Sequence, residues 1–214
     1  MNEPFRLSSN VRLQTVRSML FGASSGHACA VVDPDFCPQI IAMIEQHRVE
    51  HAALLGPHFA PDLLRRSPHL VRLEPFSPFS EWLLSGWGLS WGIYAVSSAS
   101  MDALREHFRS LLMVLDPSGT LLFFRYYDPR VFGVYLPTVN EQEAGAVFGP
   151  VESYVFEEED THAILRFVRG KKQMQAERFA VVSGVAAQPA ALGTQHSGHT
   201  TPESELNTRH HEHA

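Results

Sequence analysis

The chain has 214 residues, of which 44% are hydrophobic and 19% are charged, and its formal net charge is −6 at pH 7. This composition is ordinary for a globular domain, and the acidic balance argues against a surface that neutralises nucleic-acid phosphates. Two cysteines, Cys29 and Cys37, make no disulfide framework, and no segment approaches the roughly 18 apolar residues of a membrane span. Because the N-terminus has no signal-peptide pattern, we expect a cytoplasmic protein that binds neither nucleic acid nor membrane.

The first part of the chain predicts alternating strands and helices. Residues 1–26 form an N-terminal segment, and the compact apolar run over 27–33 predicts a buried strand. Asp35 then has the position of a cap for a helix that runs to about residue 47, and 51–57 predicts a second strand. A strand, a helix and another strand in this order indicate a βαβ unit, which implies a parallel pair.

The middle of the chain continues this alternation. Residues 77–88 predict a short helix that glycines end, and 90–98 predict a third strand. Apolar residues recur at helical spacing over 100–115, which predicts an amphipathic helix. The run over 120–127 is almost continuously apolar, so we expect a fourth strand near the centre of the sheet.

Two further helices are expected after these strands. Asp128 has the position of an N-cap for a helix that runs to about residue 136, with proline at its first position. Thr138 and Glu141 have the spacing of a capping box for the next helix.

The C-terminal part predicts a hairpin and then a loss of order. Two strands near 151–157 and 162–169 flank an acidic turn and predict an antiparallel hairpin. A possible short helix over 171–185 precedes a small, polar segment, 186–214, which we expect to be a disordered tail. The sequence therefore predicts one α/β domain over 27–170, with a mainly parallel sheet, helices on both faces and a C-terminal antiparallel hairpin.

One short motif suggests a hydrolase. The letters GLSWG, residues 88–92, match the G-x-S-x-G pattern of a nucleophile elbow with Ser90 as the nucleophile. That elbow needs a strand before the serine and a helix after it, whereas here a predicted helix precedes Ser90 and a strand follows. The alternative interpretation is a turn between two glycines. A small serine hydrolase is thus the second functional hypothesis.

Other candidate groups do not form a catalytic set. Asp33 and Asp35 resemble a carboxylate pair but also fit turn and helix-cap positions. Cys37 lies at a predicted helix start, a position that can favour the thiolate form of a cysteine nucleophile. No His or Asn partner for such a nucleophile is identifiable. Five of the 12 histidines lie in the last 19 residues, where they could hold a divalent metal loosely. No glycine-rich phosphate loop is present, so we expect no cofactor and no fixed metal site.

The segment FFRYYDPRVFGVYL, residues 123–136, places charges inside an apolar run. A guanidinium such as that of Arg125 needs a partner there, because an unpaired buried charge costs several kcal/mol. Asp128 is the nearest candidate, which suggests an Arg125–Asp128 pair that fixes the turn. Tyr126 and Tyr127 should point to opposite faces of the strand, so one of them could join an arginine in a binding surface. Both interpretations stay open.

Three blocks in this order resemble a known family: WGLSWGIYAVSS, LREHFRSLLMVLDPSGTLLFFRYYDPRV and FGPV. They are similar to the adaptor domain of type VI secretion systems, long catalogued only as a domain of unknown function. The resemblance covers roughly residues 27–152. The positions that match its motifs are Trp87, Trp91, Leu104, Arg109, Gly119, Arg125, Tyr127, Asp128, Pro129, Arg130, Phe148 and Gly149.

The resemblance implies a non-enzymatic cytoplasmic chaperone, or adaptor. Such a protein binds a toxic effector and hands it to the tip of the cognate spike protein. The resemblance also implies that the tryptophans and the Arg–Tyr–Asp segment serve structure or partner contact rather than catalysis.

Overall fold

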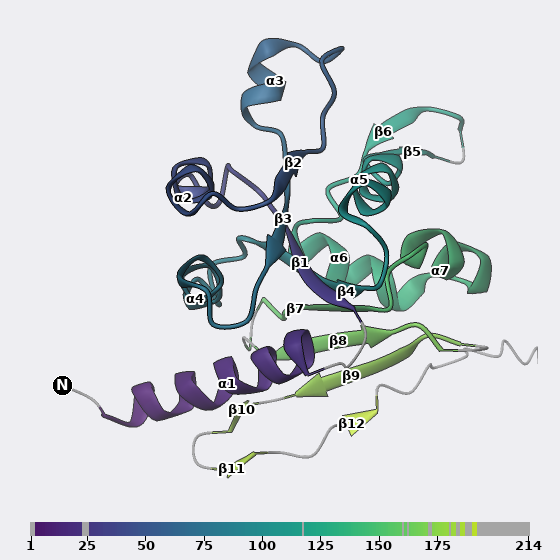
Figure 1. Ribbon diagram of the computed structural model, residues 1–214. Helices are drawn as coiled ribbons and strands as arrows, with labels where there is room; N and C mark the ends of the chain where they lie inside the picture. The colour runs from purple at the N-terminus through teal and green to yellow at the C-terminus, as the bar shows by residue number, and fades with distance from the viewer. Residues whose placement is uncertain are drawn as a thin grey trace, which may run out of the picture.

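The computed structural model describes residues 3–22, 26–116, 118–159, 161, 163–170, 173–179, 181–182, 185–186 and 190–191 (Figure 1). The helices of this part are α1 (Glu3–Phe21), α2 (Ile40–His47), α3 (Pro61–Arg65), α4 (Pro78–Ser85), α5 (Met101–Ser110), α6 (Pro129–Tyr135), η1 (Leu136–Thr138) and α7 (Glu141–Phe148). The tail predicted for 186–214 lies almost wholly outside the described residues.

The sheet that organises the fold is antiparallel. Its eight strands have the order β12-β9-β8-β7-β4-β1-β3-β2, and every neighbouring pair runs in opposite directions. The strands are β1 (His27–Val32), β2 (His51–Ala53), β3 (His69–Leu73), β4 (Gly92–Ser97), β7 (Ser153–Glu157), β8 (Ile164–Val168), β9 (Gln175–Phe179) and β12 (Ala190–Ala191). The prediction of a mainly parallel sheet is therefore wrong.

The error has a local origin in β3, a strand that the sequence interpretation missed. β3 lies between β1 and β2 and is antiparallel to both. The strands of the expected βαβ unit therefore run in the same direction but do not pair. A strand–helix–strand pattern fixes the relative direction of two strands, and another strand can still separate them.

Helices cover both faces of the sheet, and each face has its own apolar core. Along β1, Cys29 and Val31 point to the face that carries α5, α6 and α7, whereas Ala28, Ala30 and Val32 point to the face that carries α1, α2 and α4 (Figure 1). A central strand is thus buried on both sides, although alternation in strands usually distinguishes an apolar face from a polar one. The N-terminal segment joins this core through α1.

The C-terminal strands extend the sheet on one side. The antiparallel pair expected near 151–157 and 162–169 is found as β7 and β8. β9 then pairs with β8, so the possible short helix over 171–185 is a strand over Gln175–Phe179 instead. Two further short strands, β10 (Val181–Val182) and β11 (Val185–Ala186), pair with each other.

The apolar run over 120–127 is not a central strand. The helix predicted over 100–115 ends at Ser110, and β5 (Met113–Leu115) pairs with β6 (Leu121–Phe123) in a separate two-stranded hairpin. All three residues of β6 are exposed. Residues 124 and 125 then lead to α6.

Helix capping follows the predicted chemistry with two shifts in position. Asp128 caps α6, because its carboxylate accepts the backbone N–H of Arg130. The capping box of α7 uses Asn140 and Glu143 rather than Thr138 and Glu141. Likewise, α2 begins at Ile40, and Asp35 lies in the preceding turn instead of capping that helix.

Across the helices of the described residues, none is both long and apolar enough to cross a membrane.

Candidate functional site

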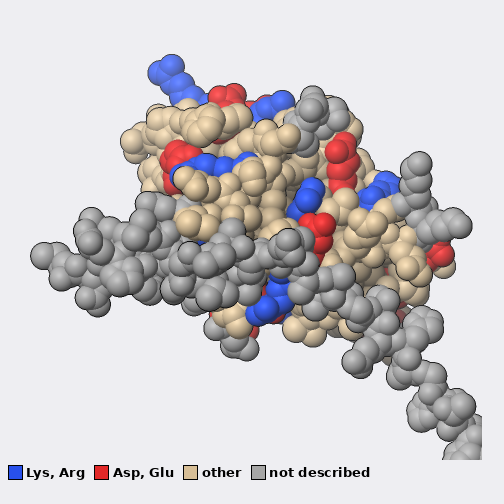
Figure 2. Space-filling view, turned by 90° about the horizontal axis from the view of Figure 1, so that it is seen from below, with Lys and Arg blue, Asp and Glu red and all other residues tan. Residues whose placement is uncertain are grey.

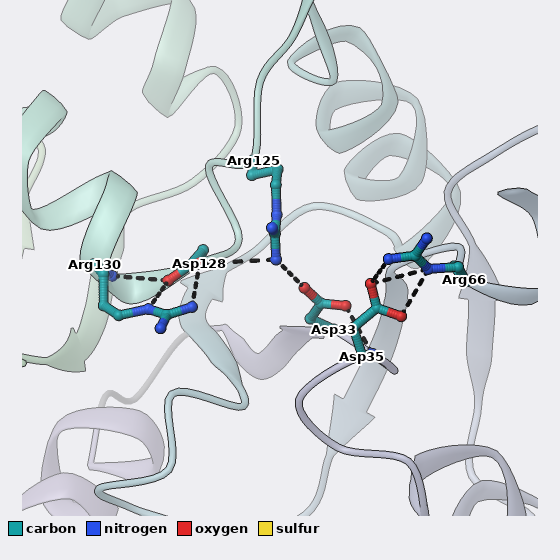
Figure 3. A network of polar contacts seen from close by, with 6 residues as sticks. All are labelled: Asp33, Asp35, Arg66, Arg125, Asp128 and Arg130. Carbon is teal, nitrogen blue, oxygen red and sulfur yellow. Dashed lines mark hydrogen bonds and ion pairs between the residues drawn. The ribbon is translucent and has the colours of Figure 1, made fainter.

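Six charged side chains meet beyond the end of β1 (Figure 3). They come from the turn after β1, the residue after α3, the segment before α6 and the first turn of α6. We refer to them as the Arg–Asp cluster, which consists of Asp33, Asp35, Arg66, Arg125, Asp128 and Arg130.

Arg125 and Asp33 form the central pair of the cluster. Nη2 of Arg125 donates to Oδ2 of Asp33 at 2.8 Å, whereas Oδ2 of Asp128 lies 3.8 Å away, beyond hydrogen-bond distance. The side chain of Asp33 is 3% exposed, and that of Arg125 is 41% exposed. The predicted Arg125–Asp128 pair is therefore only the longer of two contacts, and Arg125 is bonded mainly to a residue 92 positions away.

Asp128 and Arg130 form a second pair inside the first turn of α6. Nε and Nη2 of Arg130 donate to the two carboxylate oxygens of Asp128 at 2.9 and 2.7 Å. Such a two-point contact fixes the plane of a guanidinium as well as its position. Asp128 is buried, while Arg130 keeps about a third of its side chain exposed. The buried carboxylate thus holds an arginine at the surface.

The third pair lies on the turn after β1. Nε of Arg66 donates to both carboxylate oxygens of Asp35, at 2.9 and 3.0 Å. The backbone N–H of Asp35 donates to Oδ1 of Asp33, so this turn connects the third pair to the central one. The Phe36 ring lies 4.4 Å from the guanidinium carbon of Arg130 and 5.6 Å from that of Arg125, within the range of a cation–π contact.

Contacts within the cluster shift the pKa values of Asp35, Arg125 and Arg130 in favour of their charged forms. The hydrogen bond from Arg66 lowers the pKa of the Asp35 carboxyl. The hydrogen bond to Asp128 raises the pKa of Arg130. Burial opposes the charge of Arg125, but its hydrogen bond and attraction to Asp33 outweigh burial and raise its pKa. In the face shown by Figure 2, basic and acidic side chains are likewise interspersed among the described residues.

Both tyrosines of the segment are buried. The hydroxyl of Tyr126 donates to the carbonyl of Phe108 at 2.9 Å, and its ring lies among Phe108, Phe124 and Phe132. Tyr127 is also buried, and burial together with the charge of Asp33 raises its pKa to about 12. The expectation that one of the two would be exposed is wrong, since Tyr126 and Tyr127 lie in a turn and not in an extended strand.

Trp87 and Trp91, the two tryptophans that the sequence analysis singled out, lie on the face of the sheet that carries α1, α2 and α4. Trp87 stacks on Tyr94 with ring centroids 5.8 Å apart, and Trp91 packs against Trp82 at 5.2 Å. A methyl group on Gly86 would lie 2.1 Å from a Trp91 ring carbon, so only glycine allows this ring position. Both tryptophans are partly exposed, but neither lies in the Arg–Asp cluster.

The GLSWG loop folds around a buried carboxylate. Glu157, at the end of β7, accepts the backbone N–H groups of Gly88 and Ser90. Ser90 has a positive φ of 52° and lies between α4 and β4, so the order of elements is helix, loop, strand. Within the described residues, no hydrogen bond links its hydroxyl to a histidine. The hydrolase hypothesis therefore gains no support from the geometry of this loop.

A cleft of about 960 Å³ opens at the opposite end of β1. Its lining mixes His27 and two arginines with Glu50 and Glu74. Nε2 of His27 is buried there without a hydrogen-bond partner, and burial lowers the pKa of this imidazole, helped by the charge of Arg72. The described part of the chain holds no group of three or more His, Cys, Asp or Glu side chains placed to bind a metal. The histidines of the tail lie outside it.

Sequence reasoning missed three residues that organise these sites. Asp33 was interpreted as a turn residue, although it directly follows a buried strand and is itself buried. Arg66 carries no sequence signal, because its partner is 31 positions away. Glu157 stands at the end of a strand whose other residues are all buried, and that burial was the available signal.

The chain was compared with known families, curated proteins and solved structures. Residues 29–146, more than half of the chain, match the family described as "Domain of unknown function (DUF4123)". The chain belongs to this family. No curated protein and no solved structure matches it.

The DUF4123 match runs from β1 to α7 and contains all six residues of the Arg–Asp cluster. It also contains the GLSWG loop and the β5–β6 hairpin. β7, β8 and β9 lie beyond it, so Glu157, which holds the loop, comes from outside the matched segment.

Proposed function

We propose that this DUF4123 protein is a non-enzymatic adaptor, or chaperone, which binds an effector toxin of a type VI secretion system and loads it onto the cognate spike protein. It would act in the cytoplasm and in stoichiometric amounts. The sequence blocks that resemble the adaptor family support this proposal. Two of the three lie within the segment that matches DUF4123, and FGPV, residues 148–151, follows shortly after it.

One structural observation carries the proposal, namely the surface of α6 beside the Arg–Asp cluster. Val131 and Val134 are exposed there, Val134 by 75%. Next to them, Arg130 is held by the buried Asp128 and lies over Phe36. Arginine is one of the residue types enriched in binding hot spots. Because the carboxylate already fixes the guanidinium, a partner would lose little side-chain entropy on binding it.

The proposal is tested by binding of the full chain to a co-expressed effector and to the C-terminal segment of a spike protein. Val134→Asp places a charge on the proposed contact surface without touching the core. Phe76→Asn is the matched control, because Phe76 is 81% exposed on the segment before α4 and has a φ of 57°, which asparagine tolerates. Both variants should melt like the wild type.

We expect Val134→Asp to weaken effector or spike binding about tenfold or more, which corresponds to about 1.4 kcal/mol. Phe76→Asn should bind normally. Equal binding by all three proteins would exclude the α6 surface as the contact. The absence of binding by the wild type to both candidate partners would contradict the adaptor function itself.

A further inference from the structure

The β5–β6 hairpin, which we refer to as the arm (Met113–Phe123), projects beyond α5 (Figure 1). Its two strands pair only with each other among the strands of the described residues. The carboxylate of Asp116 accepts the backbone N–H groups of Ser118 and Thr120, which orders the turn between the strands. An isolated two-stranded hairpin is at best marginally stable in water, whereas three strands with an apolar face are stable.

The arm carries much of the exposed apolar surface. Five of the eleven exposed large hydrophobic side chains in the described part of the chain belong to it, namely Val114, Leu115, Leu121, Leu122 and Phe123. Successive residues of a strand point to opposite faces, so both faces of the ribbon are apolar. At roughly 100 Å² for each side chain, the arm exposes on the order of 500 Å² of apolar area, divided between its two faces.

Within the described part of the chain, no strand pairs with the outer edge of β6 and no backbone hydrogen bond is made there. Phe124 donates to the carbonyl of Leu112, and Asp116 donates to that of Thr120, so these two pairs face inward. Hydrogen-bonded and non-hydrogen-bonded pairs alternate in an antiparallel ladder. With Val114 opposite Leu122, the inward pairs are the even-numbered ones. Leu121 and Phe123 therefore direct their N–H and C=O groups away from β5.

We propose that this edge of β6 is the docking site for an extended, apolar segment of the partner protein, which adds to the arm as a third strand. Such an addition uses main-chain hydrogen bonds for affinity and side-chain contacts for specificity. It would bury the exposed leucines and complete a three-stranded sheet. That the partner is a protein rests on the proposed function; the edge and its apolar side chains come from the structure.

Two other occupants fit less well. A second copy of the chain would bring two chains of formal net charge −6 together, and like net charge opposes self-association. A helix satisfies its own backbone groups, so it would leave the outward groups of Leu121 and Phe123 unpaired. An extended segment can cover the apolar side chains of the arm and also pair with the outward backbone groups of Leu121 and Phe123.

The test compares Leu121→Pro with Leu121→Ala in the full chain. Both variants lose the leucine side chain, but only proline removes the outward N–H, and edge strands tolerate proline at such positions. The probe is a fluorescein-labelled peptide of alternating valine and threonine with lysine at both ends. A second peptide has the same sequence with every backbone amide between its terminal lysines methylated, so that neither of its edges can donate hydrogen bonds to β6. Circular dichroism and melting curves verify the fold of each variant.

We expect the wild type to bind the unmethylated peptide and Leu121→Ala to bind it a few-fold more weakly. Leu121→Pro should lose about tenfold or more, and the methylated peptide should not bind. Equal affinity of the proline and alanine variants would overturn the inference, and so would an arm-dependent dimer in analytical ultracentrifugation.

A measurement on the wild type keeps the inference falsifiable if the proline variant does not fold. The peptide should slow amide hydrogen exchange at Leu121 and Phe123, while the amide of Leu122 is already bonded within the arm. Unchanged exchange at a saturating peptide concentration would overturn the inference.

The inference and the proposed function can fail separately. If Leu121→Pro still captures effector and spike normally, docking at the arm is refuted while the adaptor function is retained. If neither partner binds the wild type but the peptide does, the adaptor function is refuted while docking at the edge of β6 is retained.

Discussion

Replacement of Arg125 by alanine tests whether the Arg–Asp cluster joins distant parts of the fold. The variant removes the guanidinium that donates to Asp33 at 2.8 Å, so a carboxylate with a 3% exposed side chain loses its cationic partner. Asp33 keeps the backbone N–H of Asp35 as a donor, and Asp128 keeps its two bonds from Arg130. The main loss is therefore the hydrogen-bonded contact between the end of β1 and the segment before α6, and the longer contacts of Arg125 with Asp128 and Phe36 are lost with it.

The expected cost lies between two limits. Removal of one partner of a fully buried pair costs about 3–5 kcal/mol, whereas an exposed pair contributes about 1 kcal/mol or less. The side chain of Arg125 is 41% exposed, so water can partly hydrate Asp33 after the substitution. We expect a loss of about 2 kcal/mol of unfolding free energy. For a protein of this size that corresponds to a decrease in melting temperature of about 4–8 °C.

Chemical denaturation and calorimetry measure this loss, and a double-mutant cycle isolates the pair. Asp33→Asn keeps an acceptor for the backbone of Asp35, and its coupling to Arg125→Ala should be about 1–2 kcal/mol. Arg66→Ala, which removes a far more exposed arginine, should leave the melting temperature unchanged within error. Zero coupling in the cycle, or an equal effect of Arg66→Ala, would refute the role given to Arg125.

Three further predictions concern the frame of the molecule. Gly86→Ala should cost about 1–3 kcal/mol, because the new methyl group would collide with the Trp91 ring, and calorimetry should detect it. Gly145→Ala is the contrasting change: within the described residues, a methyl group on Gly145 would meet no atom outside the local backbone of α7 within 4 Å, so alanine should stabilise the protein by about 0.5–1 kcal/mol. Burial lowers the pKa of His69 and of His107 in the folded protein. As the pH falls, these histidines are therefore protonated in the unfolded chain before they are protonated in the folded one. Stability should therefore decrease as pH falls below about 6.5, and a flat melting temperature between pH 7.5 and 5.5 would contradict this.

The sequence was sufficient for the central strands but not for their pairing. The apolar runs that became β1 and β4 were predicted within one or two residues. The mainly parallel arrangement of the sheet was predicted wrongly, because a strand buried on both faces has the same apolar pattern in a parallel sheet and in this antiparallel one. β3 was missed, and its position between β1 and β2 decides the topology.

The arm shows why an apolar run does not establish burial. Residues 120–127 are as apolar as a central strand, yet β6 is exposed along its whole length. The apolar stripe of α5 predicts a helix to Leu115, but the helix ends at Ser110 and Met113–Leu115 pair with β6. Local sequence cannot distinguish a side chain that packs in the core from one that is exposed on a projecting hairpin.

The candidate site was predictable in its chemistry and not in its partners. A charge at Arg125 within an apolar segment required a carboxylate, and the structure has one at hydrogen-bond distance. Asp33 provides it from 92 positions away, because the turn after β1 and the segment before α6 meet beside the sheet. Asp128 was expected to pair with Arg125, but its short contacts are with Arg130. Only the tertiary fold decides between two nearby carboxylates.

The measurement that tests the adaptor function most directly is capture of partners from the native host. The full chain, with a tag at its N-terminus, is purified while the secretion system is expressed, and the bound proteins are identified by mass spectrometry. We predict recovery of a large toxin together with a spike protein, and loss of at least one of them with Val134→Asp. Recovery of neither protein by the wild-type chain would contradict the adaptor function.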